Sequence, residues 1–410
     1  MSTRNSSRRR LSLSTSLFAL SSSLCLVALG CGDDMDLPVD ELGDETDTGS
    51  ADADDDIGSE TDSSGETGTE SESESESESG SDESESETET ETDTEESDTE
   101  ESPNQSCING QFLNGDSPGP DYDEFDIIFG SHCNGTNHQD INDIERVVFL
   151  GDSITVGTPP TEAGDAYRSR VAEELSLLWG LDAPTLLWQQ YDPFNGTAII
   201  KEDGDFAVCA KWGARNDDFL TGGQQLEDCF PPQDRLARTL VITTMGGNDI
   251  AAMAKDQIEG VTEAALWDDA ESMLTHMRSG MEWLVDPQRF PNGVFVVYAN
   301  VFEYTDATVD LLACPAAGAA GFDSNPEDPE LTVEYIRYIN SEYMQVAEDT
   351  QTDMVFMAEG FCGHGFRADD TQSACYRGPD QDTWFDLSCI HPTPDGHEAL
   401  ANMFLDVILE

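Results

Sequence analysis

The chain has 410 residues, of which 86 are acidic and only 18 are Lys or Arg, and its formal net charge is −68. No basic patch is visible, so the sequence excludes an electrostatic nucleic-acid-binding surface. Residues 32–106 contain 32 acidic residues and no Lys or Arg. Such a segment buries too little apolar surface to offset its ordering entropy, which predicts a disordered acidic tether. Residues 107–410 suit one large domain with a sizeable core.

The first 31 residues have the pattern of a bacterial lipoprotein signal peptide. Four arginines at positions 4, 8, 9 and 10 precede an apolar, Ser-rich stretch, and the segment that ends at Cys31 resembles a lipobox. We expect export and acylation of Cys31, which would anchor the chain to the outer membrane or cell surface without a membrane span. An ordinary signal peptide, with release into the medium, is the alternative. A cation-binding or partner-binding role for residues 32–106 is a weaker alternative to a tether.

Eight cysteines follow residue 31, at positions 107, 133, 209, 229, 314, 362, 375 and 389. An even number in an exported chain favours disulfides. Proximity along the sequence favours the pairs 107–133, 209–229 and 362–375, which leaves 314–389. A metal site built from Cys362, His364 and Cys375 fits no common zinc spacing. We expect neither a metal nor an organic cofactor.

From residue 144 onward, short apolar runs alternate with helical patterns. The patterns predict strands at 146–150, 184–189, 239–244, 293–299 and 353–358, and helices at 166–179, 261–284, 331–350 and 395–408. This alternation predicts an α/β fold with a central parallel sheet covered on both faces. Residues 144–410 would form the domain that carries the chemistry, and residues 107–143 a Cys-containing N-terminal extension.

Three polar residues fall where functional sites of such folds lie, at the carboxyl ends of strands or beside them. Ser153 ends a Gly-Asp-Ser triplet directly after the first predicted strand, so its N–H and hydroxyl face the crevice. Asn248 follows the third predicted strand, and its amide can donate to a developing negative oxygen. His391 precedes the last predicted helix and can act as a general base. Each residue alone is equally typical of a turn, a helix cap or a structural histidine.

Together these segments resemble the SGNH, or GDSL, hydrolase family over residues 144–410, and the region around 361–391 is similar to its secreted, disulfide-bonded lipases and esterases. The resemblance implies a flavodoxin-like, three-layer α/β/α sandwich. It implies Ser153 as nucleophile and His391 as base, with an oxyanion hole formed by the N–H groups of Ser153 and Gly213 and the Asn248 amide. Gly213 matches the family chiefly by its position.

The sequence departs from the family pattern just before His391. The family usually has Asp three residues before this histidine, where this chain has Ser388, and Asp386 lies five residues before it. A carboxylate stabilises an imidazolium better than a neutral carbonyl does. Reach favours a backbone carbonyl of Ser388 or Cys389, which we expect to orient His391, with Asp386 or an acid elsewhere as the alternatives.

The sequence thus predicts a serine ester hydrolase of the esterase or lipase type that forms an acyl-enzyme on Ser153. Its substrates would be small-molecule, lipid or acetylated-carbohydrate esters, and we expect no nucleic acid and no obligate protein partner. A carbohydrate O-acetylesterase would use the same residues. A non-catalytic, surface-binding lipoprotein with a degenerate fold is a second alternative, which Ser388 favours and the set of Ser153, Asn248 and His391 opposes.

Overall fold

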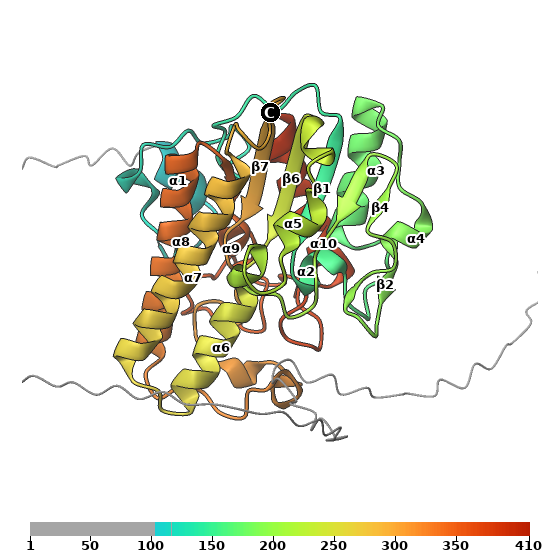
Figure 1. The fold of residues 1–410 in the computed structure, drawn as a ribbon. Coiled ribbons are helices and arrows are strands. Elements are labelled where there is room, and N and C mark those ends of the chain that lie inside the picture. Colours follow the sequence, from blue (N-terminus) through green and yellow to red (C-terminus); the bar gives the residue numbers. More distant parts are fainter. Residues whose placement is uncertain (1–102, 116) are drawn as a thin grey trace, which may run out of the picture. The chain divides into compact units, whose positions relative to one another are not determined.

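The computed structural model describes residues 103–115 and 117–410 (Figure 1). The predicted signal peptide, Cys31 and nearly all of the predicted tether lie outside the described residues. Within the described part of the chain, no helix combines the length and the apolar character needed to cross a membrane.

The described chain contains one large sheet, whose strands run in the order β4-β5-β1-β6-β7-β8. All neighbours from β5 to β8 pair in parallel, whereas the edge strand β4 is antiparallel to β5. The parallel strands follow the doubly wound order 2-1-3-4-5, which is flavodoxin-like. In chain order the strands are β1 (Arg146–Gly151), β4 (Glu202–Asp203), β5 (Phe206–Val208), β6 (Thr239–Thr244), β7 (Val294–Ala299) and β8 (Asp353–Val355).

Helices cover both faces of the sheet (Figure 1). On one face, Val147 and Phe149 of β1 belong to the core that includes α3 (Tyr167–Trp179) and α10 (Pro394–Leu409). On the other face, Val148 and Leu150 belong to the core that includes α7 (Glu263–Leu284) and α8 (Pro329–Thr350). Because successive side chains of a strand point to opposite faces and both faces are covered, residues 147–150 of β1 are all apolar. The predicted three-layer α/β/α sandwich is confirmed.

Shorter elements connect these layers. The helices are α1 (Pro103–Asn109), α2 (Ser153–Val156), α4 (Leu186–Gln189), α5 (Gln225–Cys229), α6 (Gly247–Ile258) and α9 (Met357–Phe361), and β2 (Tyr191–Asp192) forms a hairpin with β3 (Thr197–Ala198). Single 3₁₀ turns lie at Tyr122–Glu124, Asn216–Phe219, Asp234–Leu236, Leu311–Ala313 and Ala317–Ala320.

Most of the predicted elements are present within a few residues of their expected bounds, but the strand predicted at 184–189 is wrong. This segment forms the short helix α4, in which Leu186 and Leu187 are exposed and Trp188 is buried. Before the helix, the Thr185 N–H donates to the Asp203 carboxylate at 2.7 Å and holds the segment outside the sheet. The strand beside β1 is instead β5, which is too short to give a periodic signal. The strand predicted at 353–358 ends at Val355.

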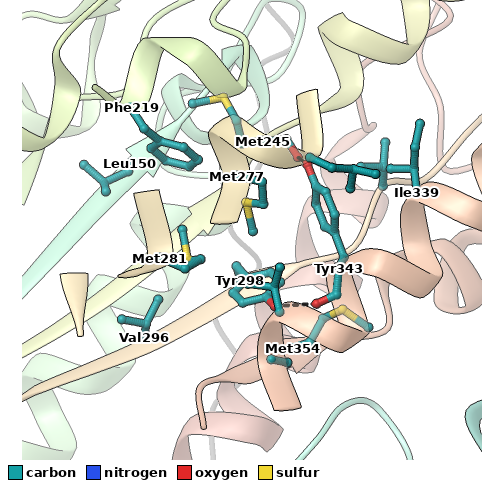
Figure 2. Packing of buried hydrophobic residues seen from close by; sticks show 14 of the residues in the cluster. Leu150, Phe219, Met245, Met277, Met281, Val296, Tyr298, Ile339, Tyr343 and Met354 are labelled. Carbon is teal, nitrogen blue, oxygen red and sulfur yellow. Dashed lines mark hydrogen bonds between the residues drawn. The ribbon is translucent and has the colours of Figure 1, made fainter. Parts of the chain in front are cut away.

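The core between the sheet and helices α7 and α8 is rich in methionine. Seven of the 11 methionines lie in this cluster, at positions 245, 253, 273, 277, 281, 344 and 354. Figure 2 shows several of them around Tyr298, whose hydroxyl donates to the Tyr343 carbonyl at 2.6 Å. The unbranched thioether side chain fills irregular gaps between aromatic rings, so it suits this face.

Four disulfides link the predicted pairs, Cys107–Cys133, Cys209–Cys229, Cys314–Cys389 and Cys362–Cys375. Because Cys362 pairs with Cys375, neither thiol is available as a metal ligand. The Cys314–Cys389 bridge joins the segment after β7 to the loop before α10, across a separation of 75 residues.

The residues of the predicted N-terminal extension pack against the β8 edge of the sheet. The Thr136 hydroxyl donates to the Asp353 carboxylate at 2.9 Å. The Gln139 side chain donates to the Val296 carbonyl at 2.8 Å and accepts from the Val296 N–H at 3.0 Å. These contacts cover a strand edge that would otherwise present unpaired backbone groups.

Candidate active site

Helix α2, whose first residue is Ser153, follows β1 at the carboxyl edge of the sheet (Figure 1). The turn needs glycine at position 151, because φ there is +126° and any Cβ would collide with the Thr244 carbonyl of β6. The Gln225 amide fixes Gly151 from both sides, since its oxygen accepts the Gly151 N–H and its nitrogen donates to the Gly151 carbonyl, each at 2.9 Å. The Asp152 carboxylate caps α2 by accepting the Ile154 N–H at 3.0 Å. Ser153 therefore begins a helix whose first turn is held rigidly.

Sequence reasoning did not single out Asp152 or Gln225. Asp152 is buried, and this burial raises its pKa to about 7, against the opposing effect of its hydrogen bonds from the Ile154 N–H and the Thr244 hydroxyl. A Gly-Asp-Ser triplet gives the position of Asp152 but no sign that its carboxyl is enclosed. Gln225 is 74 residues from Gly151, so no local pattern could identify it.

The structure brings His391 against Ser153. The His391 Nε2 atom lies 2.8 Å from the Ser153 Oγ atom, and both side chains are buried. Burial lowers the pKa of His391 to about 4, so the imidazole is neutral at neutral pH and able to accept a proton. The helix that follows, α10, is capped by the Thr393 hydroxyl, which accepts the Gly396 N–H at 3.2 Å and fixes the chain just after the histidine.

The expected backbone acceptor for the other ring nitrogen is wrong. The His391 Nδ1 atom lies 2.7 Å from the Ser388 Oγ atom, a side-chain hydroxyl. Cys389 has a φ of +73°, so the loop turns between Ser388 and His391 and brings the serine side chain to the ring. The Ser388 hydroxyl also lies 2.5 Å from Asp386 Oδ1. Asp386 is therefore connected to His391 through Ser388 and not by a direct contact.

Asn248 lies on the first turn of α6, and with Ser153 it lines a shared cavity. Its amide nitrogen donates to the Ala214 carbonyl at 2.9 Å, which ties α6 to the loop of Gly213. The neighbouring Asp249 carboxylate accepts the Asn216 N–H of the same loop at 3.2 Å. Gly213 has a φ of +75° and is exposed, and it is not among the described residues that line the cavity. The structure thus places Asn248 and Ser153 in the wall of one cavity, and Gly213 next to Ala214, whose carbonyl Asn248 binds.

An open cavity extends from Ser153 and Asn248. Its walls are predominantly apolar and come from several elements, among them Ile250 and Ala251 of α6, Ile336 of α8, and Val301, Phe302, Val309, Leu311, Phe322, Phe385 and Ile390 of the loops. Ser117, Pro118 and Gly119 of the N-terminal extension complete the wall. No local sequence pattern indicates this cavity, because its lining is assembled from segments up to more than 250 residues apart.

Several solved structures of lipases and esterases are similar to this chain. No curated protein sequence matches the chain. Phospholipase A1 from Streptomyces albidoflavus NA297 is 18% identical, with a TM-score of 0.38 over 64% of this chain and 98% of that one. Extracellular lipase from Streptomyces rimosus is 18% identical, with a TM-score of 0.36 over 64% and 99%. The acetyl xylan esterase AlAXEase is 13% identical, with a TM-score of 0.39 over 64% and 99%.

The sequence model of the GDSL-like lipase/acylhydrolase family matches residues 149–399. This match covers more than half of the chain and includes Ser153, Asn248 and His391. The chain therefore belongs to the GDSL-like lipase/acylhydrolase family.

Proposed function

We propose that this protein is a serine ester hydrolase that forms an acyl-enzyme on Ser153 and prefers esters with an extended apolar acyl chain. The observation that carries the proposal is the 2.8 Å contact between Ser153 Oγ and His391 Nε2 at one end of an apolar cavity. A degenerate, non-catalytic member of the family would have no need to keep this contact, so the contact opposes that alternative.

The reaction would proceed by acyl transfer. His391 Nε2 takes the hydroxyl proton as Ser153 Oγ attacks the ester carbonyl carbon. The negative charge that develops on the carbonyl oxygen is stabilised by the Ser153 and Gly213 N–H groups and the Asn248 amide. His391 then returns the proton to the leaving alcohol, and it activates the water that releases the acid from Ser153.

The cavity favours a long acyl chain over an acetyl group. Its lining is predominantly apolar, and an acetyl group would leave most of that lining without a substrate contact. Each methylene buried against such a lining contributes about 0.8 kcal/mol. If this energy is realised in the transition state, kcat/KM rises by up to about fourfold per methylene. A carbohydrate O-acetylesterase remains the second candidate, because the residues around Ser153 serve both reactions.

Hydrolysis of acetyl, butyryl, octanoyl and palmitoyl p-nitrophenyl esters, with acetylated xylan beside them, tests the proposal. We expect kcat/KM to rise from acetyl to octanoyl, and Ser153→Ala to abolish turnover of every ester without changing thermal unfolding. A strong preference for acetyl esters would contradict the assignment of acyl chain length. Turnover by Ser153→Ala at more than a few per cent of the wild-type rate would contradict the assignment of the nucleophile.

Two matched variants on α6 test the role of the cavity. Ala251 lines the cavity, whereas Ala252 faces a separate acidic hollow that includes Asp256 and His276. Both alanines are half-buried. Ala251→Phe should lower kcat/KM for the octanoyl and palmitoyl esters while sparing the butyryl ester. Ala252→Phe should leave the dependence on chain length unchanged.

The predicted export and the lipid anchor on Cys31 complete the proposal. The chain would act outside the cytoplasm at a membrane surface, where esters with apolar acyl chains are abundant. The chain has an even number of cysteines after Cys31, and all eight are paired in disulfides. This pairing supports an oxidising compartment.

A further inference from the structure

We propose that Asp386 and Ser388 act together as positioning residues, with the Ser388 hydroxyl transmitting the effect of the Asp386 carboxylate to His391. The site would then work as a chain of four side chains, Asp386–Ser388–His391–Ser153. This inference rests on the proposed hydrolase function and adds two residues to it. It also explains how a chain without Asp three residues before His391 can still orient its base.

Hydrogen-bond donors and acceptors fix the direction of this chain. Asp386 Oδ1 accepts the Ser388 N–H at 2.7 Å and lies 2.5 Å from the Ser388 hydroxyl. A hydroxyl has one hydrogen to donate, and a carboxylate only accepts, so the Ser388 hydrogen points to Asp386. The lone pairs of Ser388 Oγ are left for His391, whose backbone N–H approaches at 3.3 Å and whose Nδ1 lies at 2.7 Å.

The same assignment of hydrogen-bond donors and acceptors determines the tautomer of His391. Because Ser388 Oγ can only accept from the ring, Nδ1 must carry the hydrogen of the neutral imidazole. Nε2 then presents its lone pair to the Ser153 hydroxyl, as a general base requires. The opposite tautomer would leave two acceptors facing each other at Nδ1. Ser388 thus selects the productive form of the base.

The Asp386 carboxylate adds charge stabilisation to this geometric role. When His391 takes the Ser153 proton it becomes an imidazolium, and Nδ1–H donates to an oxygen whose own hydrogen is held by Asp386. Each proton stays on its own atom, so the chain polarises and transfers nothing beyond the Ser153 proton. Asp386 is buried, and its Oδ2 atom has no hydrogen-bond partner in the described chain. Few other groups screen or share the charge of the Asp386 carboxylate, so this charge acts on the Ser388–His391 pair.

The loop from 385 to 392 is built to hold this arrangement. Phe385 and Pro392 form an antiparallel bridge that closes it. Inside, the Asp386 N–H donates to the His391 carbonyl at 2.9 Å, and the Cys389 N–H donates to the Asp386 carbonyl at 3.0 Å. Cys389 is fully buried and bonded to Cys314. These restraints hold the loop in a tight turn. In this turn the Ser388 hydroxyl bridges the Asp386 carboxylate and the His391 ring.

A purely structural role is the competing explanation. An aspartate that accepts the N–H two residues ahead forms an ordinary Asx turn, which could stabilise the loop alone. Such a turn needs neither the Ser388 hydroxyl nor the charge of Asp386. Substitutions that remove only the hydroxyl or only the charge therefore distinguish the two explanations.

The test uses the purified full-length protein with Ser388→Ala, Ser388→Thr, Asp386→Asn and the double variant Ser388→Ala/Asp386→Asn. Leu387→Ala is the matched control, because Leu387 lies in the same turn and is 68% exposed. The measurements are kcat and KM on an ester that the wild type hydrolyses, the acid limb of kcat/KM, thermal unfolding, and the rate of labelling of Ser153 by a fluorophosphonate. Labelling shows whether the nucleophile is active at all, independently of the ester chosen.

Loss of a hydrogen bond to a charged group changes a rate by about 10–100-fold. We expect Ser388→Ala to lower kcat about 10–100-fold and Asp386→Asn to lower it about tenfold, with KM nearly unchanged. The double variant should lose no more than Ser388→Ala, because the carboxylate acts only through the hydroxyl. Ser388→Thr should keep most of the activity, Leu387→Ala all of it, and Asp386→Asn should move the acid limb to lower pH.

Two results would overturn the inference directly, and a third would do so if a single variant is destabilised. One is wild-type kcat and labelling in Ser388→Ala. The other is a double variant whose loss equals the product of the single losses, since that would mean that the two residues act independently. If a single variant is destabilised, Ser388→Thr decides, because restored stability without restored kcat would also refute the relay. A wild type that neither hydrolyses esters nor reacts with the fluorophosphonate would instead refute the proposed function itself.

Discussion

Removing the Cys314–Cys389 disulfide should lower both the stability of the protein and the activity of the molecules that remain folded. The bridge spans 75 residues. In the chain-entropy treatment, closing a loop of that length restricts the unfolded chain by about 4.5 kcal/mol. The Cys107–Cys133 bridge spans 26 residues, which gives about 3.5 kcal/mol. Cys314→Ala/Cys389→Ala should therefore cost about 1 kcal/mol more than Cys107→Ala/Cys133→Ala.

The two bridges differ more in their effect on catalysis. Cys389 lies two residues before His391, whereas neither Cys107 nor Cys133 belongs to the loop that carries the base. A misplacement of about 1 Å can cost about 10²-fold in rate. We expect kcat on a butyryl ester to fall by about tenfold or more in Cys314→Ala/Cys389→Ala. The control pair should leave it close to the wild-type value.

Equilibrium unfolding in urea gives the two free energies, and steady-state kinetics well below the unfolding transition give kcat. Each kcat is corrected for the folded fraction, so that a loss of activity is not confused with unfolding. Wild-type kcat in Cys314→Ala/Cys389→Ala would refute the reasoning, because the loop would then hold His391 without its covalent anchor. Equal losses of kcat in both pairs would refute it as well.

Three further predictions concern single groups. Asn248→Ala should lower kcat by about 10²–10³ with little change in KM, because the oxyanion charge develops only in the transition state, and an unchanged kcat would remove Asn248 from the site. Since burial lowers the pKa of His391 to about 4, kcat/KM should persist below the ordinary histidine range and be lost as pH falls through that value; an acid limb near 6.5 would contradict this. Cys31→Ser should release the protein from membranes, and mass spectrometry should find acyl chains on Cys31 of the native protein; an unmodified N-terminus elsewhere would contradict the anchor.

The low pKa of His391 has a second consequence, for stability. The unfolded chain binds a proton at the ordinary histidine pKa, near 6.5, while the folded protein binds it only near 4. The contribution of His391 to the free energy of unfolding should therefore fall as pH drops from about 6.5 to 4, whereas buried Asp152, whose pKa is raised to about 7, contributes a change of the opposite sign. Urea unfolding of the wild type and of His391→Asn at several pH values in that window measures the His391 contribution as the difference between the two proteins.

The sequence predicted those parts of the fold whose signal is local. β1, β6 and β7 are continuous apolar runs, and α7 and α8 carry a long helical period, so each was placed within a few residues. The strand predicted around Trp188 was wrong because a run of four to six apolar residues is compatible with a strand and with a helix. In the structure Thr185 binds Asp203, 18 residues further along the chain, a contact that no local pattern contains.

The candidate site likewise contains residues that local sequence patterns predict and residues that they do not. Ser153, Asn248 and His391 could be found because each follows a strand or precedes a helix, which brings them to one edge of the sheet. The partner of His391 Nδ1 could not be found, because it depends on the path of five residues and on a left-handed φ at Cys389. The short distance along the chain favoured a backbone carbonyl as the acceptor for Nδ1. The turn instead brings the Ser388 side chain to this nitrogen.

The methionine-rich core also provides an internal probe of conformational opening. Methionine is oxidised to a polar sulfoxide only where an oxidant can reach its sulfur. Met277, Met281 and Met354 are fully buried between the sheet and helices α7 and α8 (Figure 2). Peptide mass spectrometry can follow the rate at which peroxide modifies these methionines. This rate would measure how often the core between the sheet and helices α7 and α8 opens transiently, without a label or an introduced residue.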